Sequence, residues 1–357
     1  MYIETTGVVK PCCASKVPYG NIHEQPLDEI INGPIHLEVK RSLLEGRPHR
    51  HCQSCYQAEK SYGDSTRYWF NQRLPVDTPE IEDFRLQMID IRWSNNCNLK
   101  CLYCSETFSS SIAEFRKIDQ KLSIRQWQDQ VMQMIKNNIV HIKEVYLLGG
   151  EPLLIKENSE LLDYLTDQRI SVFTNLSLDN SKNPIYKKLI TKPNVSWEIS
   201  LEQTGKKFEY VRNGASWDQV LKNYNDLKSQ GKNVSFTMQY CIYSALDLHA
   251  VLTELKCHGT VVINLLLYPG YLALNGHCDT IKKIAVSEID RVISDANLID
   301  WLGSDNLEKL LHIKTSIYDI KMPDQSKRFV DNEKNIPGPV SFSELWPEAW
   351  RAIVAAQ

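Results

Sequence analysis

The sequence contains no apolar run approaching the roughly 20 residues that cross a lipid bilayer. Its first residues, MYIETTGVVKPCC, lack the charged and then apolar segments of a secretory signal peptide. The formal net charge of −3 gives no excess of lysine and arginine of the kind that covers a phosphate backbone. We therefore expect a cytoplasmic protein that has neither nucleic acid nor a membrane among its main partners.

Low-complexity tracts and internal repeats of short period are also missing from the sequence. The 357 residues, 42% hydrophobic and 24% charged, can bury at least one large core and exceed the length of one average domain. The chain should therefore hold a main domain and something smaller.

The ten cysteines are unlikely partners in disulfides, because a reducing cytoplasm keeps thiols reduced. Clustered cysteines in such a protein indicate metal binding instead. The clustered ones are Cys12, Cys13, Cys52, Cys55, Cys97, Cys101 and Cys104. Cys241, Cys257 and Cys278 stand alone, and we expect them to be small, mostly buried hydrophobic residues.

From residue 86 onward, short runs of strand-forming residues alternate with segments of helical periodicity. The predicted strands are 86–93, 144–148, 170–174, 194–201, 233–242 and 260–268. Predicted helices lie near 159–166, 184–190, 216–229 and 247–257, after an earlier helix that opens at Ser123. Ser123 and Ser216 are the expected caps, each followed three residues later by a glutamine.

Near-continuous apolar strands joined by helices predict a parallel sheet covered on its outer face. Six such units are fewer than the eight of a closed barrel. We therefore expect an α/β fold, a partial (β/α)6 TIM-like barrel over residues 83–270. A small cysteine-rich module at 1–82 should precede the barrel, and a mostly helical extension at 271–357 should follow it. Chemistry belongs at the carboxyl ends of the strands.

Three of the clustered cysteines follow the first predicted barrel strand with the spacing C-x3-C-x2-C, as Cys97, Cys101 and Cys104. A structural zinc site normally takes four protein ligands and is closed. A four-iron cluster held by three thiolates leaves one iron free to bind something else. These three residues are therefore the expected catalytic metal ligands.

This spacing, with Tyr103 just before the last cysteine, resembles the signature of the radical S-adenosylmethionine (SAM) enzymes. The resemblance implies a 4Fe-4S cluster whose unique iron is chelated by the amine and carboxylate of SAM. It further implies that the reduced cluster cleaves SAM to a 5′-deoxyadenosyl radical, which abstracts a hydrogen atom from a substrate. The protein's part is to orient SAM and to exclude water and stray hydrogen donors.

A second motif, LLGGEPLL at 147–154, follows the second barrel strand and resembles the GGEP motif of the same family. The resemblance implies that the backbone at Gly149 and Gly150 approaches the methionine amine closely, with Glu151 as a polar partner. The alternative is that these residues only form a turn.

Stretches after the later strands also resemble SAM-contacting segments of the family, with candidate residues Thr174, Asn175, Ser200, Glu202 and Arg212. Leu176 stands where relatives often have glycine after Thr-Asn, and Glu202 where they often have aspartate. The resemblance implies contact of Ser200 or Glu202 with the SAM ribose and of Arg212 with the SAM carboxylate. Glu202 and Arg212 as plain surface residues are the alternatives.

The first eighty residues resemble a further module of this family. GVVKPCC at 7–13 and CQSCYQAE at 52–59 are similar to the SPASM module, or to its shortened twitch form, although such modules usually follow the barrel. The resemblance implies an auxiliary 4Fe-4S cluster on Cys12, Cys13, Cys52 and Cys55. If the adjacent pair supplies only one ligand, an iron is open or a distant cysteine joins. A structural zinc site is the alternative.

Radical SAM proteins with such modules often modify ribosomally made peptides by crosslinking, epimerisation or backbone excision. We therefore expect a precursor peptide as substrate and an external electron donor. Because only about ten residues precede the first cysteine pair, a separate small leader-binding protein is the expected presenter. A radical SAM enzyme acting on a small metabolite or nucleoside, and a non-catalytic iron–sulfur or zinc protein, stay as alternatives.

Overall fold

The computed structural model describes residues 1–62, 65–74, 84–119, 122–266, 269–318, 322–336, 338 and 340–356. The chain forms two compact units. The first comprises residues 1–98, 105–173 and 180–196, and the second comprises residues 99–104, 174–179 and 197–357. Each unit is described by itself below.

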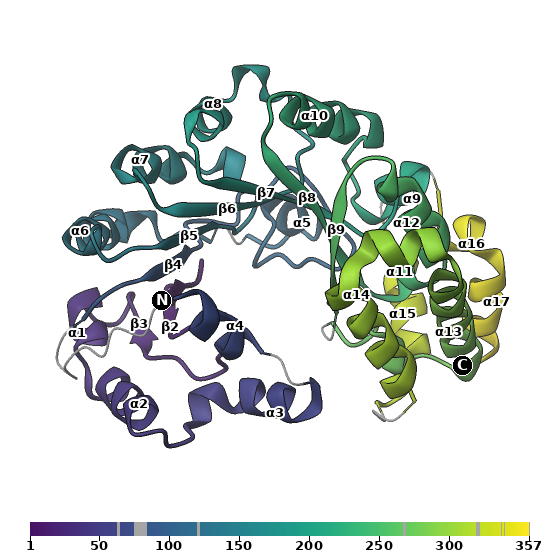
Figure 1. Cartoon of the computed structure of the whole chain (residues 1–357), viewed down its shortest axis with the longest axis horizontal. Helices are drawn as coiled ribbons and strands as arrows, with labels where there is room; N and C mark the ends of the chain where they lie inside the picture. The colour runs from purple at the N-terminus through teal and green to yellow at the C-terminus, as the bar shows by residue number, and fades with distance from the viewer. Residues whose placement is uncertain are drawn as a thin grey trace. The chain divides into compact units, whose positions relative to one another are not determined.

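The first unit is built on a mostly parallel sheet (Figure 1). Its strands are β1 (Tyr2–Ile3), β2 (Val8–Lys10), β3 (Gly20–Asn21), β4 (Met88–Ile91), β5 (Glu144–Leu147) and β6 (Arg169–Thr174), and β7 (Val195–Leu201) begins in this unit. The spatial order is β3-β2-β1-β4-β5-β6. Strand β1 is parallel to β4, β4 to β5 and β5 to β6, whereas β2 is antiparallel to both of its neighbours.

Helices and 3-10 turns connect these strands. They are α1 (Leu27–Ile31), α2 (Pro34–Leu44), η1 (Arg50–Cys52), α3 (Gln53–Tyr62), α4 (Thr66–Arg73), α5 (Ser110–Phe115), η2 (Arg125–Trp127), α6 (Gln128–Asn138), η3 (Pro152–Leu154), α7 (Lys156–Tyr164), η4 (Asn180–Lys182) and α8 (Pro184–Thr191). Figure 1 shows α6, α7 and α8 on the outer side of strands β4 to β6.

The two faces of this sheet differ in chemistry, because successive side chains of a strand point to opposite faces. One row across β4, β5 and β6 is aliphatic and buried, with Ile89 opposite Val145 and Val145 opposite Ile170. The row one residue further along is polar and aromatic, formed by Tyr2, Asp90, Tyr146 and Ser171. The sheet therefore has an apolar face toward its helices and a more polar face on the other side.

The second unit holds the end of β7, strands β8 (Asn233–Tyr240) and β9 (Thr260–Leu265), and many helices. Strands β8 and β9 are parallel, with Phe236 opposite Val261. The helices are α9 (Gly205–Val211), α10 (Trp217–Ser229), α11 (Ile242–Ala245), α12 (Leu248–Lys256), η5 (Leu274–Gly276), α13 (Asp279–Ser294), α14 (Ala296–Ser316), α15 (Ser326–Glu333), α16 (Phe342–Leu345) and α17 (Pro347–Ala355).

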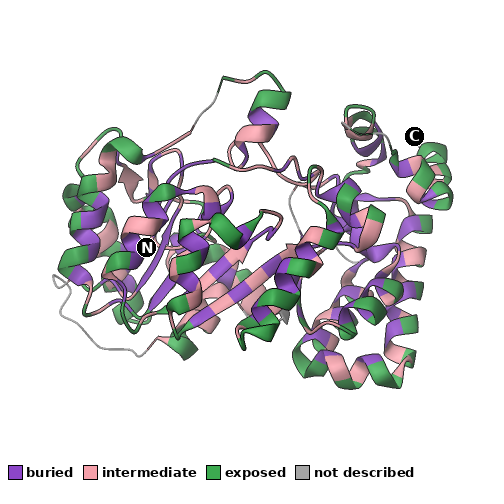
Figure 2. Ribbon diagram, turned by 90° about the horizontal axis from the view of Figure 1, so that it is seen from above, coloured by how far each residue is buried: buried purple, intermediate pink, exposed green. Residues whose placement is uncertain are grey.

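An aromatic cluster packs the last helices of the second unit onto α11. Tyr243 of α11 lies about as close to Phe329 as to Phe342, with ring centroids 6.1 Å apart in both pairs. Phe342 in turn lies 4.9 Å from Trp346, and all four rings are buried. Figure 2 shows the general pattern, in which helices carry a buried side and an exposed side. The C-terminal helices are thus part of the core of this unit.

The predicted fold class is confirmed, because the described strands form an open, mostly parallel order between helices rather than a closed ring. All six predicted barrel strands form within a few residues of their expected bounds, although residues 267 and 268 lie outside the described part. The domain boundaries stay predictions, and the one at 82/83 falls among residues that are not described. Within the described residues, no helix is both long and apolar enough to cross a membrane.

One of the two predicted helix caps is wrong. Ser216 does cap α10, because its side chain accepts a hydrogen bond from the backbone N–H of Gln219. The hydroxyl of Ser123 instead accepts from the N–H of Arg125 and donates to the carbonyl of Trp93. Helix α6 begins only at Gln128, after the 3-10 turn η2, so Ser123 ties a loop to the end of β4 rather than capping the helix.

Candidate functional site

The GGEP turn docks on the start of the cysteine loop within the first unit. The N–H of Gly150 donates to the carbonyl of Ser94 at 3.4 Å, and that of Glu151 donates to the carbonyl of Asn96 at 2.8 Å. A Cβ on Gly150 would lie 2.1 Å from the carbonyl oxygen of Asn96, so a larger residue cannot fit without moving backbone. Because Asn96 directly precedes Cys97, this turn fixes the entry to the cysteine motif.

The other two residues of the motif have structural reasons of their own. Gly149 has a φ of +118°, which favours glycine. The buried Glu151 accepts a hydrogen bond from the N–H of Leu153 at 3.2 Å and so caps η3. Gly150 therefore makes a tight backbone contact with Asn96, and one carboxylate oxygen of Glu151 is used to cap η3. The expected approach of both glycines to the methionine amine of SAM stays a prediction.

Cys97 belongs to the first unit, and two serines of α5 hold its backbone. Its carbonyl accepts from the hydroxyls of Ser110 at 3.3 Å and Ser111 at 2.7 Å, and its N–H donates to Ser110 at 3.2 Å. The residue is half-buried. The backbone that carries this thiol is thus fixed.

Cys101 and Cys104 belong to the second unit, where the segment after α9 pairs with their loop. The N–H of Lys100 donates to the carbonyl of Asn213 and that of Leu102 donates to the carbonyl of Val211, both at 2.9 Å. Cys101 therefore lies between two backbone hydrogen bonds. The N–H of Cys104 donates to the carbonyl of Cys101 at 3.0 Å, which closes a turn between the two thiols.

A buried ion pair lies beside Cys101 in the same unit. The guanidinium of Arg212 donates to both carboxylate oxygens of Glu202, at 2.9 and 3.0 Å, and both residues are buried. The Arg212 guanidinium also lies 5.3 Å from the ring centroid of Tyr103. Burial opposes the charge of Arg212, but Glu202, Tyr103 and Cys101 together outweigh it and raise the pKa of the guanidinium. Burial raises the pKa of Glu202, and Arg212 works against that rise.

These surroundings fit a metal–thiolate ligand at Cys101. Burial raises the pKa of the Cys101 thiol, and the positive charge of Arg212 offsets part of that rise. A thiolate ligand carries negative charge into a buried place, and a fixed guanidinium nearby makes that charge less costly. Neither Arg212 nor Glu202 is a surface residue, so that alternative is wrong for both.

The Thr-Asn stretch at the end of β6 forms a strained turn within the second unit. Leu176 has a φ of +50°, the left-handed region that favours the glycine found in relatives. The side chains of Thr174 and Asn175 accept from the N–H groups of Leu176 and Ser177, both at 2.9 Å. The amide of Asn223 donates to the carbonyl of Leu176 at 2.8 Å, and burial of the leucine side chain helps to hold the turn.

Ser200 lies on the half-buried face of β7, where burial alternates residue by residue. On the same face, Glu198 accepts from the hydroxyls of Ser235 at 2.7 Å and Thr237 at 3.2 Å. Ser200 is thus available on a polar strip, whereas Glu202 is committed to Arg212.

The cysteines near the N-terminus fall into two groups within the first unit. Cys12, Cys52 and Cys55 lie within electrostatic reach of one another, and the hydroxyl of Ser54 ties α3 to the carbonyl of Ala14 at 3.0 Å. Cys13 forms the other group by itself: the residue as a whole is exposed, but burial of its thiol raises the pKa to about 11, and the charges of Asp90 and Cys12 also act to raise it. Cys13 thus differs from the other three cysteines in having a buried carboxylate beside it.

Sequence reasoning missed two charged residues at the end of β4. Asp90 is buried, and its Oδ1 atom lies 3.5 Å from Nε of Arg92. Neither atom has a hydrogen-bond partner among the described residues. The Arg92 guanidinium lies 5.0 Å from the ring centroid of Tyr2 and 5.4 Å from that of Phe108. The signal was an Asp-x-Arg pattern inside an apolar strand, on the polar face of the sheet.

The three isolated cysteines are less uniform than predicted. Cys241 is buried, Cys278 is half-buried and Cys257 is exposed, so the expectation of burial fails for Cys257. In the part of the chain that is described, no three His, Cys, Asp or Glu side chains are arranged as ligands of a single metal ion.

Comparison with protein families gives two matches. Residues 91–244 match the radical SAM superfamily, and residues 1–56 match the SPASM iron-sulfur cluster-binding domain. The chain carries a radical SAM domain. A radical SAM domain binds a 4Fe-4S cluster and S-adenosylmethionine, and a SPASM domain binds an auxiliary iron–sulfur cluster. The predicted family, its cofactors and the N-terminal place of the SPASM domain are therefore confirmed.

No curated protein matches the chain by sequence. Solved structures that resemble it include anSMEcpe with bound AdoMet, at 16% identity and a TM-score of 0.46, over 62% of this chain and 63% of that one. Streptococcus suis SuiB bound to precursor peptide SuiA has 17% identity and a TM-score of 0.40, over 73% and 65%. TYW1 with a lysine-pyruvate adduct has 14% identity and a TM-score of 0.35, over 70% and 81%. The chain thus spans slightly less than two thirds of the first two structures.

The grouping of cysteines in the SPASM domain leads to a prediction. In a background in which Cys97, Cys101 and Cys104 are alanine, Cys13→Ala should keep the iron of the auxiliary cluster, because the carboxylate of Asp90 opposes negative charge on the Cys13 thiol. Cys55→Ala should lose most of it, because Cys55 is buried beside the other two thiols. Iron and sulfide analysis with the visible absorption spectrum measures both. Equal loss in the two variants would mean that both are ligands.

Proposed function

We propose that this chain is a radical SAM enzyme in which Cys97, Cys101 and Cys104 bind the catalytic 4Fe-4S cluster. The observation that carries the proposal is the docking of the GGEP turn on residues 94 and 96, at the carboxyl end of neighbouring parallel strands. Chemistry in α/β folds is expected at that end. When bound, the cluster and SAM supply a 5′-deoxyadenosyl radical that abstracts a hydrogen atom from the substrate.

The chain's own residues then orient and shield the reactants. Gly149 and Gly150 bring backbone close to the methionine part of SAM, with Glu151 holding their turn. Thr174, Asn175 and Ser200 offer polar contacts from the ends of β6 and β7. Tyr103 and the Glu202–Arg212 pair surround Cys101, so we assign them to the support of the cluster loop and of SAM together.

The substrate proposal rests on Asp90 and Arg92. Oδ1 of Asp90 and Nε of Arg92 form an ion pair at 3.5 Å, but neither atom has a hydrogen-bond partner among the described residues. Buried polar atoms without hydrogen bonds are costly unless a ligand satisfies them. An amide group supplies one N–H donor and one C=O acceptor, which match an acceptor at Asp90 and a donor at Arg92. We therefore propose that the substrate is a ribosomally made precursor peptide, modified by crosslinking, epimerisation or backbone excision. Presentation by a separate leader-binding protein and reduction by an external electron donor belong to the same proposal.

A selection experiment tests the peptide substrate. A displayed library of random short peptides is selected against the anaerobically reconstituted parent with SAM, and in parallel against the double variant Asp90→Leu/Arg92→Met. The parent should enrich a family of related sequences, and the variant should lose them. The variant should still fold and hold iron, because an apolar pair of similar volume often replaces a buried ion pair without loss of stability.

Two results would count against this assignment. A parent that enriches no sequence above background would rule out direct binding of a peptide at Asp90 and Arg92. A double variant that enriches the same sequences as strongly as the parent would remove Asp90 and Arg92 from the substrate site.

A further inference from the structure

The helix α9 connects the cysteine loop to the C-terminal helices within the second unit. Its last residue, Val211, and the following Asn213 accept backbone hydrogen bonds from Leu102 and Lys100, on the two sides of Cys101. Between them, Arg212 reaches Glu202 and the ring of Tyr103. A displacement of α9 is therefore passed directly to the backbone around Cys101.

Two side chains of α9 point to the C-terminal helices, three residues apart and so on one face of the helix. Lys207 donates to Oδ2 of Asp247 at 2.6 Å, and its Nζ lies 5.0 Å from the ring centroid of Trp346. The hydroxyl of Tyr210 donates to the carboxylate of Glu333, the last residue of α15. Each contact joins α9 to a residue far away in the sequence.

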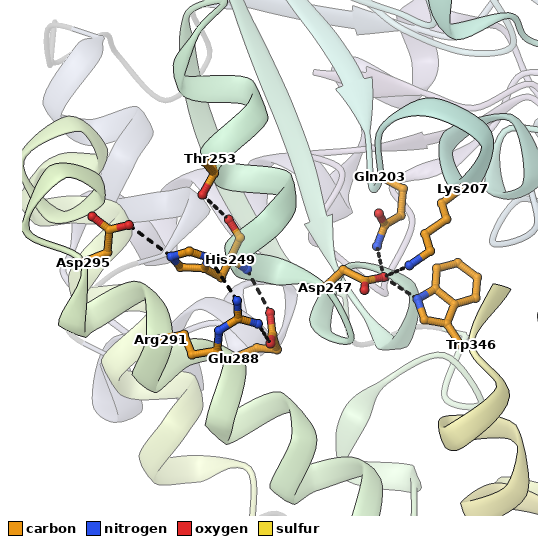
Figure 3. Close-up of polar contacts among 9 residues, drawn as sticks. All are labelled: Gln203, Lys207, Asp247, His249, Thr253, Glu288, Arg291, Asp295 and Trp346. Carbon is orange, nitrogen blue, oxygen red and sulfur yellow. Dashed lines mark hydrogen bonds and ion pairs between the residues drawn. The ribbon is translucent and has the colours of Figure 1, made fainter.

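Asp247 and Glu333 each accept hydrogen bonds from more than one side chain. The indole N–H of Trp346 and the amide of Gln203 also donate to Oδ2 of Asp247, the latter at 3.4 Å. Figure 3 shows Gln203, Lys207 and Trp346 converging on this carboxylate. Gln203 lies next to Glu202 in the sequence, and its amide donates to the carbonyl of Tyr243 at 2.6 Å.

Glu333 completes the connection on the other side. It accepts from the hydroxyl of Tyr243 at 2.6 Å as well as from Tyr210, and Tyr243 is part of the buried aromatic cluster. The described residues of the C-terminal segment, 326–355, thus contact α9 at two points: Glu333 accepts a hydrogen bond from Tyr210, and the ring of Trp346 lies beside Lys207.

We propose that the C-terminal segment positions the cysteine loop of the radical SAM domain through α9, with Asp247 and Glu333 as positioning residues. The inference rests on the proposed function, in which Cys101 and Cys104 bind the cluster that SAM contacts. Loosening α9 should shift the two hydrogen bonds that flank Cys101 and so disturb the cluster and its exchange with SAM. The C-terminal helices would then be part of the catalytic apparatus without touching a reactant.

The matched variants are Trp346→Phe, which keeps the ring and loses the N–H, and Asp247→Asn, which loses the charge that Lys207 requires. Asp295→Asn is the control, because it makes the same chemical change in the same region. Oδ2 of Asp295 lies 3.1 Å from Nε2 of His249. Figure 3 shows that the contacts of Asp295 and His249 lie apart from those of Asp247. None of its contacts among the described residues reaches α9.

The readout is the EPR spectrum of the reduced, reconstituted full-length protein with and without SAM, since only the cluster that SAM contacts responds. Loss of a supporting contact around a metal site typically costs about 10–100-fold in affinity or activity. We expect Asp247→Asn and Trp346→Phe to weaken the SAM-dependent spectral change about tenfold in apparent affinity. The control should match the parent even if its unfolding temperature falls.

The outcomes separate the two proposals. The positioning role would be overturned if Asp247→Asn and Trp346→Phe retain iron and respond to SAM as the parent does. An equal loss in Asp295→Asn would also overturn it, because general destabilisation would then explain the effect. A parent that holds iron and shows no response to SAM would defeat the proposed function, and this inference with it. If Asp247→Asn does not fold, Trp346→Phe alone decides.

Discussion

Replacing Cys97, Cys101 and Cys104 together by alanine should abolish the formation of 5′-deoxyadenosine from SAM under reducing, oxygen-free conditions. The three residues provide all of the thiolates in the C-x3-C-x2-C motif, and without them no iron is positioned to take SAM. Liquid chromatography of the reaction mixture measures the nucleoside. Loss should be complete within detection, because no other cysteine stands in this loop.

The same variant contains its own control. It should retain the iron of the SPASM domain, since Cys12, Cys52 and Cys55 are untouched, so a folded brown protein without activity is expected. Continued formation of 5′-deoxyadenosine by this variant would place the reactive cluster elsewhere. Loss of all iron would show that the two clusters are not independent.

Breaking the buried pair of Glu202 and Arg212 should have the largest effect on stability. Arg212→Met leaves a buried carboxylate without its partner, and breaking such a pair costs about 3–5 kcal/mol in free energy of unfolding. The double variant Glu202→Leu/Arg212→Met should recover most of this loss, because neither charge then remains buried. Denaturant unfolding of the reduced protein, followed by circular dichroism, measures the free energy of unfolding of the parent and of both variants.

Arg47→Met is the matched control for that experiment. The Arg47 guanidinium pairs with Glu45 at 2.5 Å, and the two side chains are 59% and 49% exposed. Exposed pairs contribute about 0–1 kcal/mol, so this variant should unfold almost as the parent does. A similar loss in Arg47→Met and Arg212→Met would mean that burial of the pair beside Cys101 has no special weight.

The strands could be predicted because each is a short, mostly apolar run, and this pattern can be recognised from neighbouring residues of the sequence alone. The cysteine loop follows β4 and the GGEP turn follows β5, as predicted, because the ends of these two strands were predicted correctly. The glycine requirement at Gly150 arises from a neighbouring carbonyl, at Asn96, which the motif alone did not identify. The sequence therefore predicted where the loop and the turn begin, but not the backbone contact that requires glycine at position 150.

Pairing of charged side chains could not be predicted, because it depends on which segments meet in space. Glu202 and Arg212 were each assigned to SAM, and the structure pairs them with each other. Tyr210 and Glu333 are 123 positions apart, so no local pattern links them. The failure at Ser123 has the opposite cause, since a tertiary hydrogen bond to Trp93 overrides a local capping pattern. Long-range contacts decided both cases.

The most direct test of the central claim is the EPR spectrum of the reconstituted parent protein, reduced without oxygen and recorded before and after addition of SAM. The account predicts the signal of a reduced 4Fe-4S cluster that changes shape when SAM is added. A protein that holds its full iron and whose spectrum is unchanged at saturating SAM would contradict the assignment of Cys97, Cys101 and Cys104 to a radical SAM cluster.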